Sequence, residues 1–250
     1  MTLPTAGSHR VWSPDEESFG RVLVTCAHPD DVDFGCSATV AAFVDHGIEV
    51  AYCIATDGEA GGNDRSQPRS EVAKIRREEQ VAAAAMVGVS DVRFLGYPDG
   101  RLSATLELRR DFTRVIRQFK PDLVIAPSPE RNWDFIYASH PDHLAAGEAS
   151  VAAVYPDSRN PFAHPELLGE GLEPYTVPAL WMMAAPASNL AVDITDTVDR
   201  KIAALSCHES QGGGGPGIAE RMGEWARGSA ATAGLPAGRL AELFWAIPTG

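Results

Sequence analysis

The chain has 250 residues, of which 34 are acidic and 21 basic, so its formal net charge is −13 at pH 7. This balance offers no basic patch to a nucleic-acid backbone or an anionic membrane surface, and we expect neither partner. With 44% hydrophobic residues the chain is not wholly disordered, and it is long enough to fold without disulfide or structural-metal staples.

Strands and helices alternate after a polar arm over residues 1–20, which has no apolar secretory run. Apolar runs predict strands over 21–27, 49–56, 92–95, 123–127, 180–184 and 190–194. Periodicity and capping signals predict helices over 35–46, 70–87, 106–119, 140–155 and 196–205, then a lid or linker over 211–217 and a last helical piece. The pattern predicts one α/β domain over 21–250. We expect a Rossmann-like three-layer fold with a mostly parallel central sheet, helices on both faces, late strands and a C-terminal helical segment.

The cysteines and the hydropathy indicate a reducing setting. None of the four cysteines belongs to a C-x-x-C pair, and Cys26 and Cys53 lie inside apolar runs, which favours buried thiols. No stretch of 18 apolar residues is present. We therefore expect a cytoplasmic protein, and the sequence leaves its oligomeric state open, with a homo-oligomer among the options.

The loops after the first four strands should meet at one rim, because parallel sheets bind ligands beyond the carboxyl ends of their strands. These loops cover residues 28–34, 57–69, 96–103 and 128–143. Their polar groups and aromatic rings suit a carbohydrate: Asp57, Glu59, Asn63, Asp64, Arg65, Asp99, Arg131, Asn132, Trp133 and Tyr137.

The first strand is followed by the string His-Pro-Asp-Asp at 28–31. A dinucleotide-binding turn would carry G-x-G-x-x-G here, so a Rossmann-type cofactor enzyme is disfavoured. A histidine and two carboxylates are instead metal ligands and proton carriers. The alternative is a turn rich in Pro and Asp in which Asp31 or Asp33 caps a helix.

The fourth strand is followed by the related string His-Pro-Asp-His at 140–143. On a helix that begins here, His140 and His143 share one face, although a solvated pair of surface histidines is the alternative. Both strings fall at carboxyl ends of predicted strands, so together they place three histidines and up to three aspartates at one rim. These nitrogen and oxygen donors suit one catalytic Zn²⁺ per chain, with Fe²⁺ or Mn²⁺ as substitutes.

Three motifs resemble those of the LmbE-like (PIG-L) zinc-dependent N-deacetylases. They are HPDDVDFG from His28, TDGEAGG from Thr56 and HPDH from His140, and the resemblance spans residues 20–210. Many relatives read HPDDE, whereas here Val32 follows and Asp33 carries the acidic group one place later.

By motif position, the resemblance implies three metal ligands: His28, Asp31 and His143. Asp30 would be the general base that takes a proton from the activated water. His140 would be the protonated partner that stabilises the oxyanion or gives a proton to the leaving amine, and Asp142 would orient or tune a histidine.

The resemblance also implies contacts with the substrate. Arg76 and Asp99 match positions that contact sugar hydroxyls, with a solvated helix charge and a turn residue as their alternatives. Tyr137 lies three residues before His140, where some relatives place a tyrosine two before, so a packing role is its alternative. His208 would line the pocket or hold His140.

We therefore expect a metal-dependent hydrolase that removes an N-acetyl group from a small N-acetylglucosamine-type glycoside or amino sugar. One alternative is an amidase that cleaves a larger thiol–sugar conjugate. Another is a non-catalytic domain that binds a sugar or metal, but no ligand or proton-carrying position of the two strings is missing, which argues against it.

Overall fold

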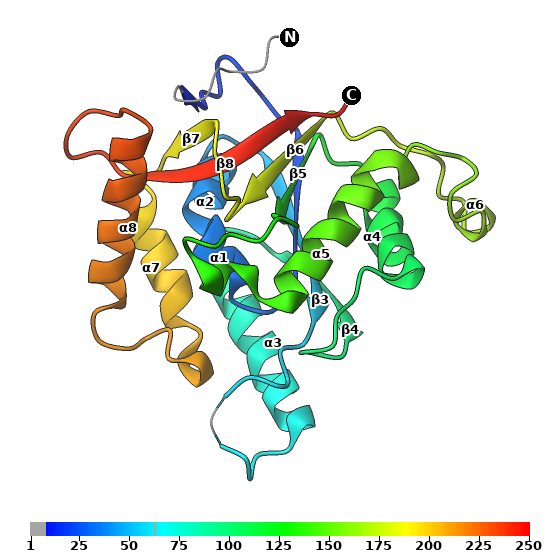
Figure 1. The fold of residues 1–250 in the computed structure, drawn as a ribbon, viewed down its shortest axis with the longest axis horizontal. Coiled ribbons are helices and arrows are strands. Elements are labelled where there is room, and N and C mark those ends of the chain that lie inside the picture. The colour runs from blue at the N-terminus through cyan, green and yellow to red at the C-terminus, as the bar shows by residue number, and fades with distance from the viewer. Residues whose placement is uncertain (1–8, 63) are drawn as a thin grey trace.

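One mixed sheet of eight strands organises the molecule in the computed structural model, which describes residues 9–62 and 64–250 (Figure 1). Its strands are β1 (Arg10–Val11), β2 (Arg21–Cys26), β3 (Glu49–Thr56), β4 (Asp91–Tyr97), β5 (Leu123–Pro127), β6 (Ala179–Met183), β7 (Leu190–Asp193) and β8 (Ala241–Pro248). The spatial order is β1-β7-β8-β6-β5-β2-β3-β4. All neighbours pair in parallel except β8, which runs antiparallel to both β6 and β7.

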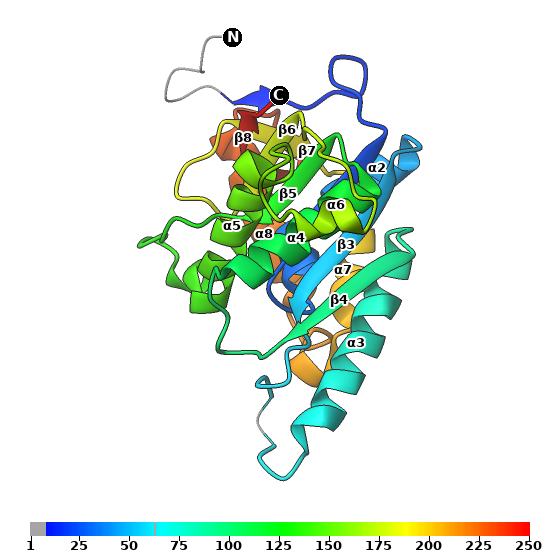
Figure 2. The same cartoon turned by 90° about the vertical axis from the view of Figure 1, so that its right-hand side faces the viewer.

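Helices cover both faces of this sheet, as Figures 1 and 2 show. They are α1 (Asp31–Gly35), α2 (Ser37–Asp45), α3 (Arg69–Met86), α4 (Leu106–Phe119), α5 (Pro141–Ala152), α6 (Glu166–Gly169), α7 (Val198–Ser206) and α8 (Ile218–Thr232). Short helical turns lie at η1 (Ile136–Ser139), η2 (Ala153–Asp157) and η3 (Glu209–Gln211). The predicted three-layer α/β fold is confirmed.

The central strands are apolar on both sides because two separate cores cover them. In β2, Val22 and Val24 pack into one core with residues of α2, α3, α7 and α8. Leu23, whose side chain points to the opposite face, packs with residues of α4 and α5. This burial on both faces fixes the register of β2 and hence the position of the loop that follows it.

Local signals predicted several elements to the residue, namely 49–56, 106–119 and 123–127. The helix predicted over 35–46 instead begins at Asp31 and is divided into α1 and α2, because Cys36 leaves the helical conformation with φ −151°. The C-terminal helical segment is present as α8, but the sequence analysis missed β8 behind it. Strand β8, which contains the apolar run Leu243–Ile247, lies inside the sheet between β6 and β7.

The predicted arm contributes an edge strand where the structure describes it, since β1 pairs with β7. Residues 1–8 of the arm lie outside the described residues. Three of the cysteines are buried and Cys207 is half-buried, all with free thiols, as expected. Within the described residues, no helix is both long and apolar enough to cross a membrane.

Candidate active site

A cavity of about 980 Å³ opens at the carboxyl ends of the central strands and is lined by residues of both His-Pro-Asp strings. The first string lies in the loop between β2 and α1, and the second begins α5. Helix α5 lies very close to the end of β5, because a Cβ atom at Gly147 would stand only 2.5 Å from the Pro127 carbonyl oxygen. Glycine at this position therefore allows the second string to reach the first.

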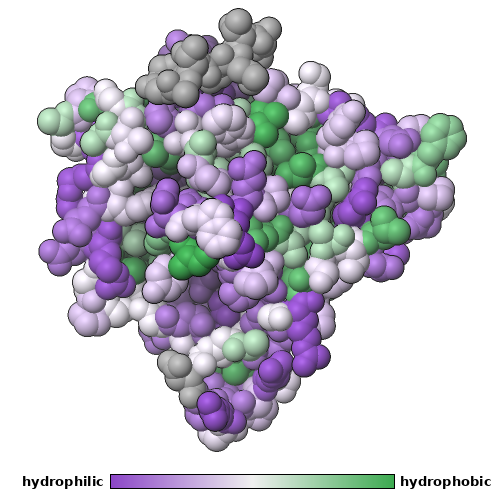
Figure 3. All heavy atoms as spheres, in the orientation of Figure 1, coloured by the Kyte–Doolittle hydropathy of each residue, from purple (hydrophilic) through white to green (hydrophobic). Residues whose placement is uncertain are grey.

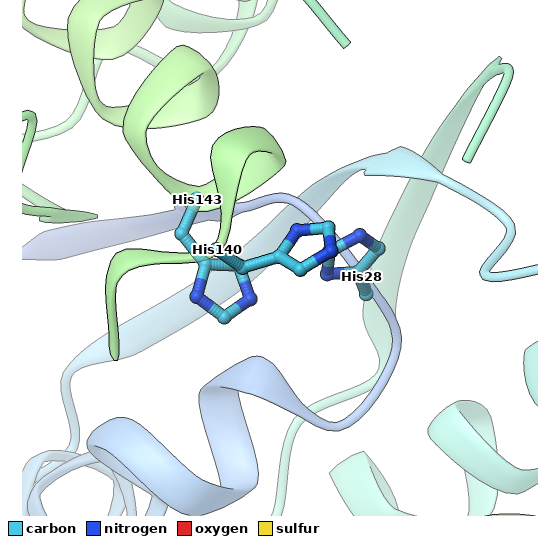
Figure 4. Close-up of side chains that lie close together, drawn as sticks. All are labelled: His28, His140 and His143. Carbon is cyan, nitrogen blue, oxygen red and sulfur yellow. The ribbon is translucent and has the colours of Figure 1, made fainter. Parts of the chain in front are cut away.

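Three histidines gather in this cavity, as Figure 4 shows for His28, His140 and His143. Their ring centroids lie 5.1 to 5.4 Å apart. Within the described residues, one potential ligand atom from each of the three lies within 4.8 Å of the others, and a second such group joins His28 to Asp99 and Asp142. The two strings thus converge, as their positions after β2 and β5 predicted.

Asp31 lies between two of these histidines. Its Oδ1 atom is 3.0 Å from His143 Nε2, and its Oδ2 atom is 3.6 Å from His28 Nδ1. The backbone N–H groups of Ala27 and His28 donate to Oδ2 at 3.0 and 2.8 Å, which fixes the carboxylate. Two imidazoles and one carboxylate, held in this way, match the donor chemistry of a catalytic Zn²⁺ site.

Three carboxylates surround the ring of His28. Burial would lower the pKa of His28, but the surrounding carboxylates, Asp31 foremost, raise it to about 12. The His28 Nε2 atom lies 3.0 Å from Asp99 Oδ1 and 3.3 Å from Asp142 Oδ2. The three carboxylates therefore keep a proton on His28 at neutral pH, in a place where a divalent cation would satisfy the same charges.

Asp30 adopts a left-handed backbone conformation, with φ +91°, and begins α1. Its backbone N–H donates to Gln80 Oε1 at 2.7 Å, and its Oδ2 atom accepts from Arg76 Nη2 at 3.1 Å. Burial and the neighbouring Asp31 carboxylate raise the pKa of Asp30 to about 6, although Arg76 opposes the rise. A carboxylate tuned in this way suits a general base near neutral pH.

Arg76 lies in a cradle built by the glycines of the TDGEAGG motif. It is 4% exposed and also donates to the carbonyls of Gly58 and Pro29, at 2.8 and 2.6 Å. Cβ atoms at Gly58 and Gly61 would come within 2.3 and 2.7 Å of its Nη1 atom, so a side chain at either position would displace the guanidinium, and Gly58 in addition has a positive φ of +67°. Arg76 lines the cavity, but its described contacts hold Asp30 and the two loops.

His140 lines the cavity, and the backbone of Asp142 orients its ring. His140 Nδ1 accepts from the Asp142 backbone N–H at 3.2 Å, so the other nitrogen, Nε2, carries the proton of the neutral ring. Partial burial, together with His28 and His143, lowers the pKa of His140. The neutral ring is thus favoured over the protonated one that the resemblance implied, and it still offers an N–H donor.

Of two residues predicted to contact the substrate, Tyr137 lines the cavity and His208 does not. Tyr137 is 82% exposed. The prediction for His208 is wrong, because its ring is fully buried and its Nε2 atom lies 2.8 Å from Asp33 Oδ2, not beside His140. Asn63 lies outside the described residues.

Gln80, which the sequence pattern did not reveal, connects these buried groups to the site. Its Nε2 atom donates to Asp33 Oδ2 at 2.9 Å, while its oxygen holds the Asp30 N–H. Gln80 follows Arg76 by four residues and so lies on the same face of α3. That spacing was the available signal, but no local pattern marks a fully buried glutamine on a helix rich in exposed charge.

Comparison with known proteins finds related deacetylases. Residues 23–154 match the model of the PIG-L family, described as GlcNAc-PI de-N-acetylase. The chain is 35% identical over 191 residues to the diacetylchitobiose deacetylase of Thermococcus kodakarensis, covering 76% of this chain and 70% of that protein. It is 29% identical over 197 residues to a probable N-acetyl-alpha-D-glucosaminyl L-malate deacetylase 2 of Bacillus anthracis, covering 76% and 80%.

A solved structure shares both the fold and sequence similarity. The N,N'-diacetylchitobiose deacetylase from Pyrococcus horikoshii superposes with a TM-score of 0.82 at 33% identity, and the match covers 92% of this chain and 85% of that one.

Proposed function

The chain belongs to the PIG-L family, and from that premise we propose that it hydrolyses the N-acetyl group of a small N-acetylglucosamine-type sugar conjugate. The observation that carries the proposal is the convergence of the two His-Pro-Asp strings on one cavity, where Asp31 lies between His28 and His143 and Asp30 lies beside them. The similar proteins named above are deacetylases of such amino sugars.

His28, Asp31 and His143 would hold the metal, and their donor set favours Zn²⁺, with Fe²⁺ or Mn²⁺ as substitutes. When bound, a divalent cation supplies Lewis acidity, which lowers the pKa of a water and polarises an amide carbonyl. The raised pKa of His28 is consistent with this assignment, because the carboxylates that raise it would equally attract a divalent cation bound in the same place. Asp99 and Asp142 contact His28 from the other side and fix its ring.

Asp30 would take the proton from the attacking water. Its carboxylate borders the cavity, and the ion pair with Arg76 fixes the position of that carboxylate. With a pKa near 6, Asp30 is ionised at neutral pH and still basic enough to accept a proton.

His140 would donate the hydrogen bond of its Nε2–H group to the amide oxygen as negative charge develops there. Its Nδ1 atom is already occupied by the Asp142 N–H, which orients the ring. The nitrogen of the broken amide takes up the proton that Asp30 removed from the water and leaves as an amine, so one water and one amide yield acetate and the amino sugar.

Release of acetate from N-acetylglucosaminides by the zinc-loaded protein tests the proposal. We expect acetate and free amine in equal amounts. An amide of a cysteine-derived acyl group on the same sugar, assayed in parallel, would reveal the amidase alternative by preferential cleavage. A fully metal-loaded protein that releases no acetate from any N-acetyl sugar would contradict the proposal.

A further inference from the structure

The cavity has two ends of opposite chemical character. The residues described above gather at a charged end, within 28–143. The other end is apolar and is formed by side chains from α1, β6, α8 and β8: Phe34, Met183, Met222, Trp225 and Leu243. On the face of the molecule that Figure 3 shows, hydrophobic and hydrophilic residues lie side by side around the middle.

The apolar end is open to a ligand. Phe34 and Trp225 are each 42% exposed, although large apolar side chains of this kind are normally buried. Exposed apolar groups that share a cavity with a reactive cluster mark a binding surface. The cavity volume of about 980 Å³ lies near the upper end of the range of roughly 300–1,000 Å³ for small-molecule sites, so it has room for more than one sugar ring.

This apolar wall is held in place by a buried cation. Lys201 Nζ donates to the Phe34 carbonyl at 2.7 Å and lies 5.1 Å from the centroid of the Trp225 ring. The same atom is paired with Glu242 Oε1 at 2.5 Å, and both side chains are almost fully buried. Lys201 therefore holds the backbone of Phe34 and the ring of Trp225, and its own charge is neutralised by Glu242 away from the cavity.

The described residues that line the cavity include no unengaged Lys or Arg for an anionic group. Among its described lining residues, Arg76 is the one Lys or Arg, and its guanidinium is engaged by Asp30 and by two carbonyls. Several carboxylates at the charged end would repel a second negative charge. An acidic substituent on the sugar would thus have no Lys or Arg partner among the described lining residues, whereas a neutral apolar substituent would contact the apolar side chains.

We propose that the apolar end is the subsite for the group attached to the amino sugar, and that it takes a neutral alkyl or aryl substituent. The inference rests on the proposed deacetylase function and names its substrate class. The wall residues Met183, Met222, Trp225 and Leu243 all lie outside the segment 23–154 that matches the family model. This chain would therefore share its chemistry with the family and choose its substrate with a segment beyond that match.

The test compares kcat/KM for N-acetylglucosaminides that carry methyl, hexyl, phenyl or malyl groups. We expect hexyl and phenyl to exceed methyl by at least about tenfold, because each methylene buried in an apolar site contributes roughly fourfold. The malyl conjugate should fall below the methyl glycoside. Equal values for hexyl and methyl, or the highest value for malyl, would overturn the inference and leave the deacetylase function standing.

A pair of matched variants locates the effect. Trp225→Ala should remove most of the hexyl preference, whereas Phe162→Ala, at a residue that is 88% exposed and outside the cavity lining, should keep it. Binding of the hexyl and methyl glycosides, measured by calorimetry, separates the two proposals. Tight binding of the hexyl glycoside without acetate release would refute the proposed function alone, and equal binding would refute the subsite.

Discussion

The two His-Pro-Asp strings share three residues and differ in almost everything else. In the first, Asp30 stands before α1 in a left-handed conformation, and His28 is only 7% exposed. In the second, Pro141 begins α5, Asp142 is 1% exposed in the first helical turn, and His140 is exposed. The same three residue types thus have a buried histidine, His28, in the first string and a buried aspartate, Asp142, in the second.

The two aspartates consequently differ in how easily they take a proton. Burial beside another carboxylate raises the pKa of Asp30 to about 6. Burial also acts to raise the pKa of Asp142, but its contact with His28 and the N–H donors of Gly100 and Leu102 lower it. Contact with His28 and the backbone donors thus favours the ionised form of Asp142, while Asp30 takes up a proton more easily.

The largest effect should come from the residue that joins the strings. Asp31→Ala removes the carboxylate between His28 and His143, so we expect the bound metal to fall from about one per chain to near zero and turnover to fall to background. Elemental analysis of the purified protein measures this directly. Asp45→Ala, at an exposed ion pair with Arg200, is the control and should retain its metal. A fully loaded Asp31→Ala protein would contradict the ligand assignment.

The next test exchanges the proton carrier of the first string. Asp30→Asn keeps the size and the contact with Arg76 but cannot accept a proton, so kcat should fall about 10²- to 10⁴-fold. The metal content should stay at the level of the unmodified protein, which distinguishes this variant from Asp31→Ala. Near-normal turnover would show that Asp30 is not the base.

The corresponding change in the second string should be milder. Asp142→Asn weakens the support of His28 and leaves the Gly100 and Leu102 donors facing an amide, so metal affinity should fall about 10- to 100-fold. Competition with a chelator of known affinity measures the change. If Asp142→Asn lowered kcat as much as Asp30→Asn without any loss of metal, the two aspartates would not differ in the way described above.

The last effect, about tenfold for each pH unit, concerns the pH dependence of metal binding. The pKa of His28 is raised from 6.5 to about 12 in the metal-free chain, so its stabilising contribution is complete below pH 6.5 and is lost as the pH rises toward 12. A metal must displace this proton, and its apparent affinity should increase about tenfold per pH unit between ~6 and ~8. Calorimetry in buffers of different ionisation enthalpy should find a proton released on binding. An affinity independent of pH would refute this account of His28.

The sequence predicted those parts of the molecule that depend on neighbours in the chain. The α/β alternation, the strand 123–127 and the convergence of both strings at one rim all follow from local pattern and from the rule for parallel sheets. His208 could not be placed in the same way, because its partner Asp33 lies 175 residues away and local pattern does not reveal a buried pair. Gln80 and β8 were missed for the same reason, since tertiary packing determines what each contacts.

The position of β8 has a consequence for biosynthesis. It fills an internal place in the sheet, between β6 and β7, although it is the strand that emerges from the ribosome after all the others described. The second string is synthesised about a hundred residues earlier and the first about two hundred, yet no strand connects β7 to β6 until residues 241–248 are synthesised. A nascent chain must therefore carry its complete set of candidate metal ligands on an unfinished sheet with open edges, the state in which strands are most prone to pair with the wrong partner.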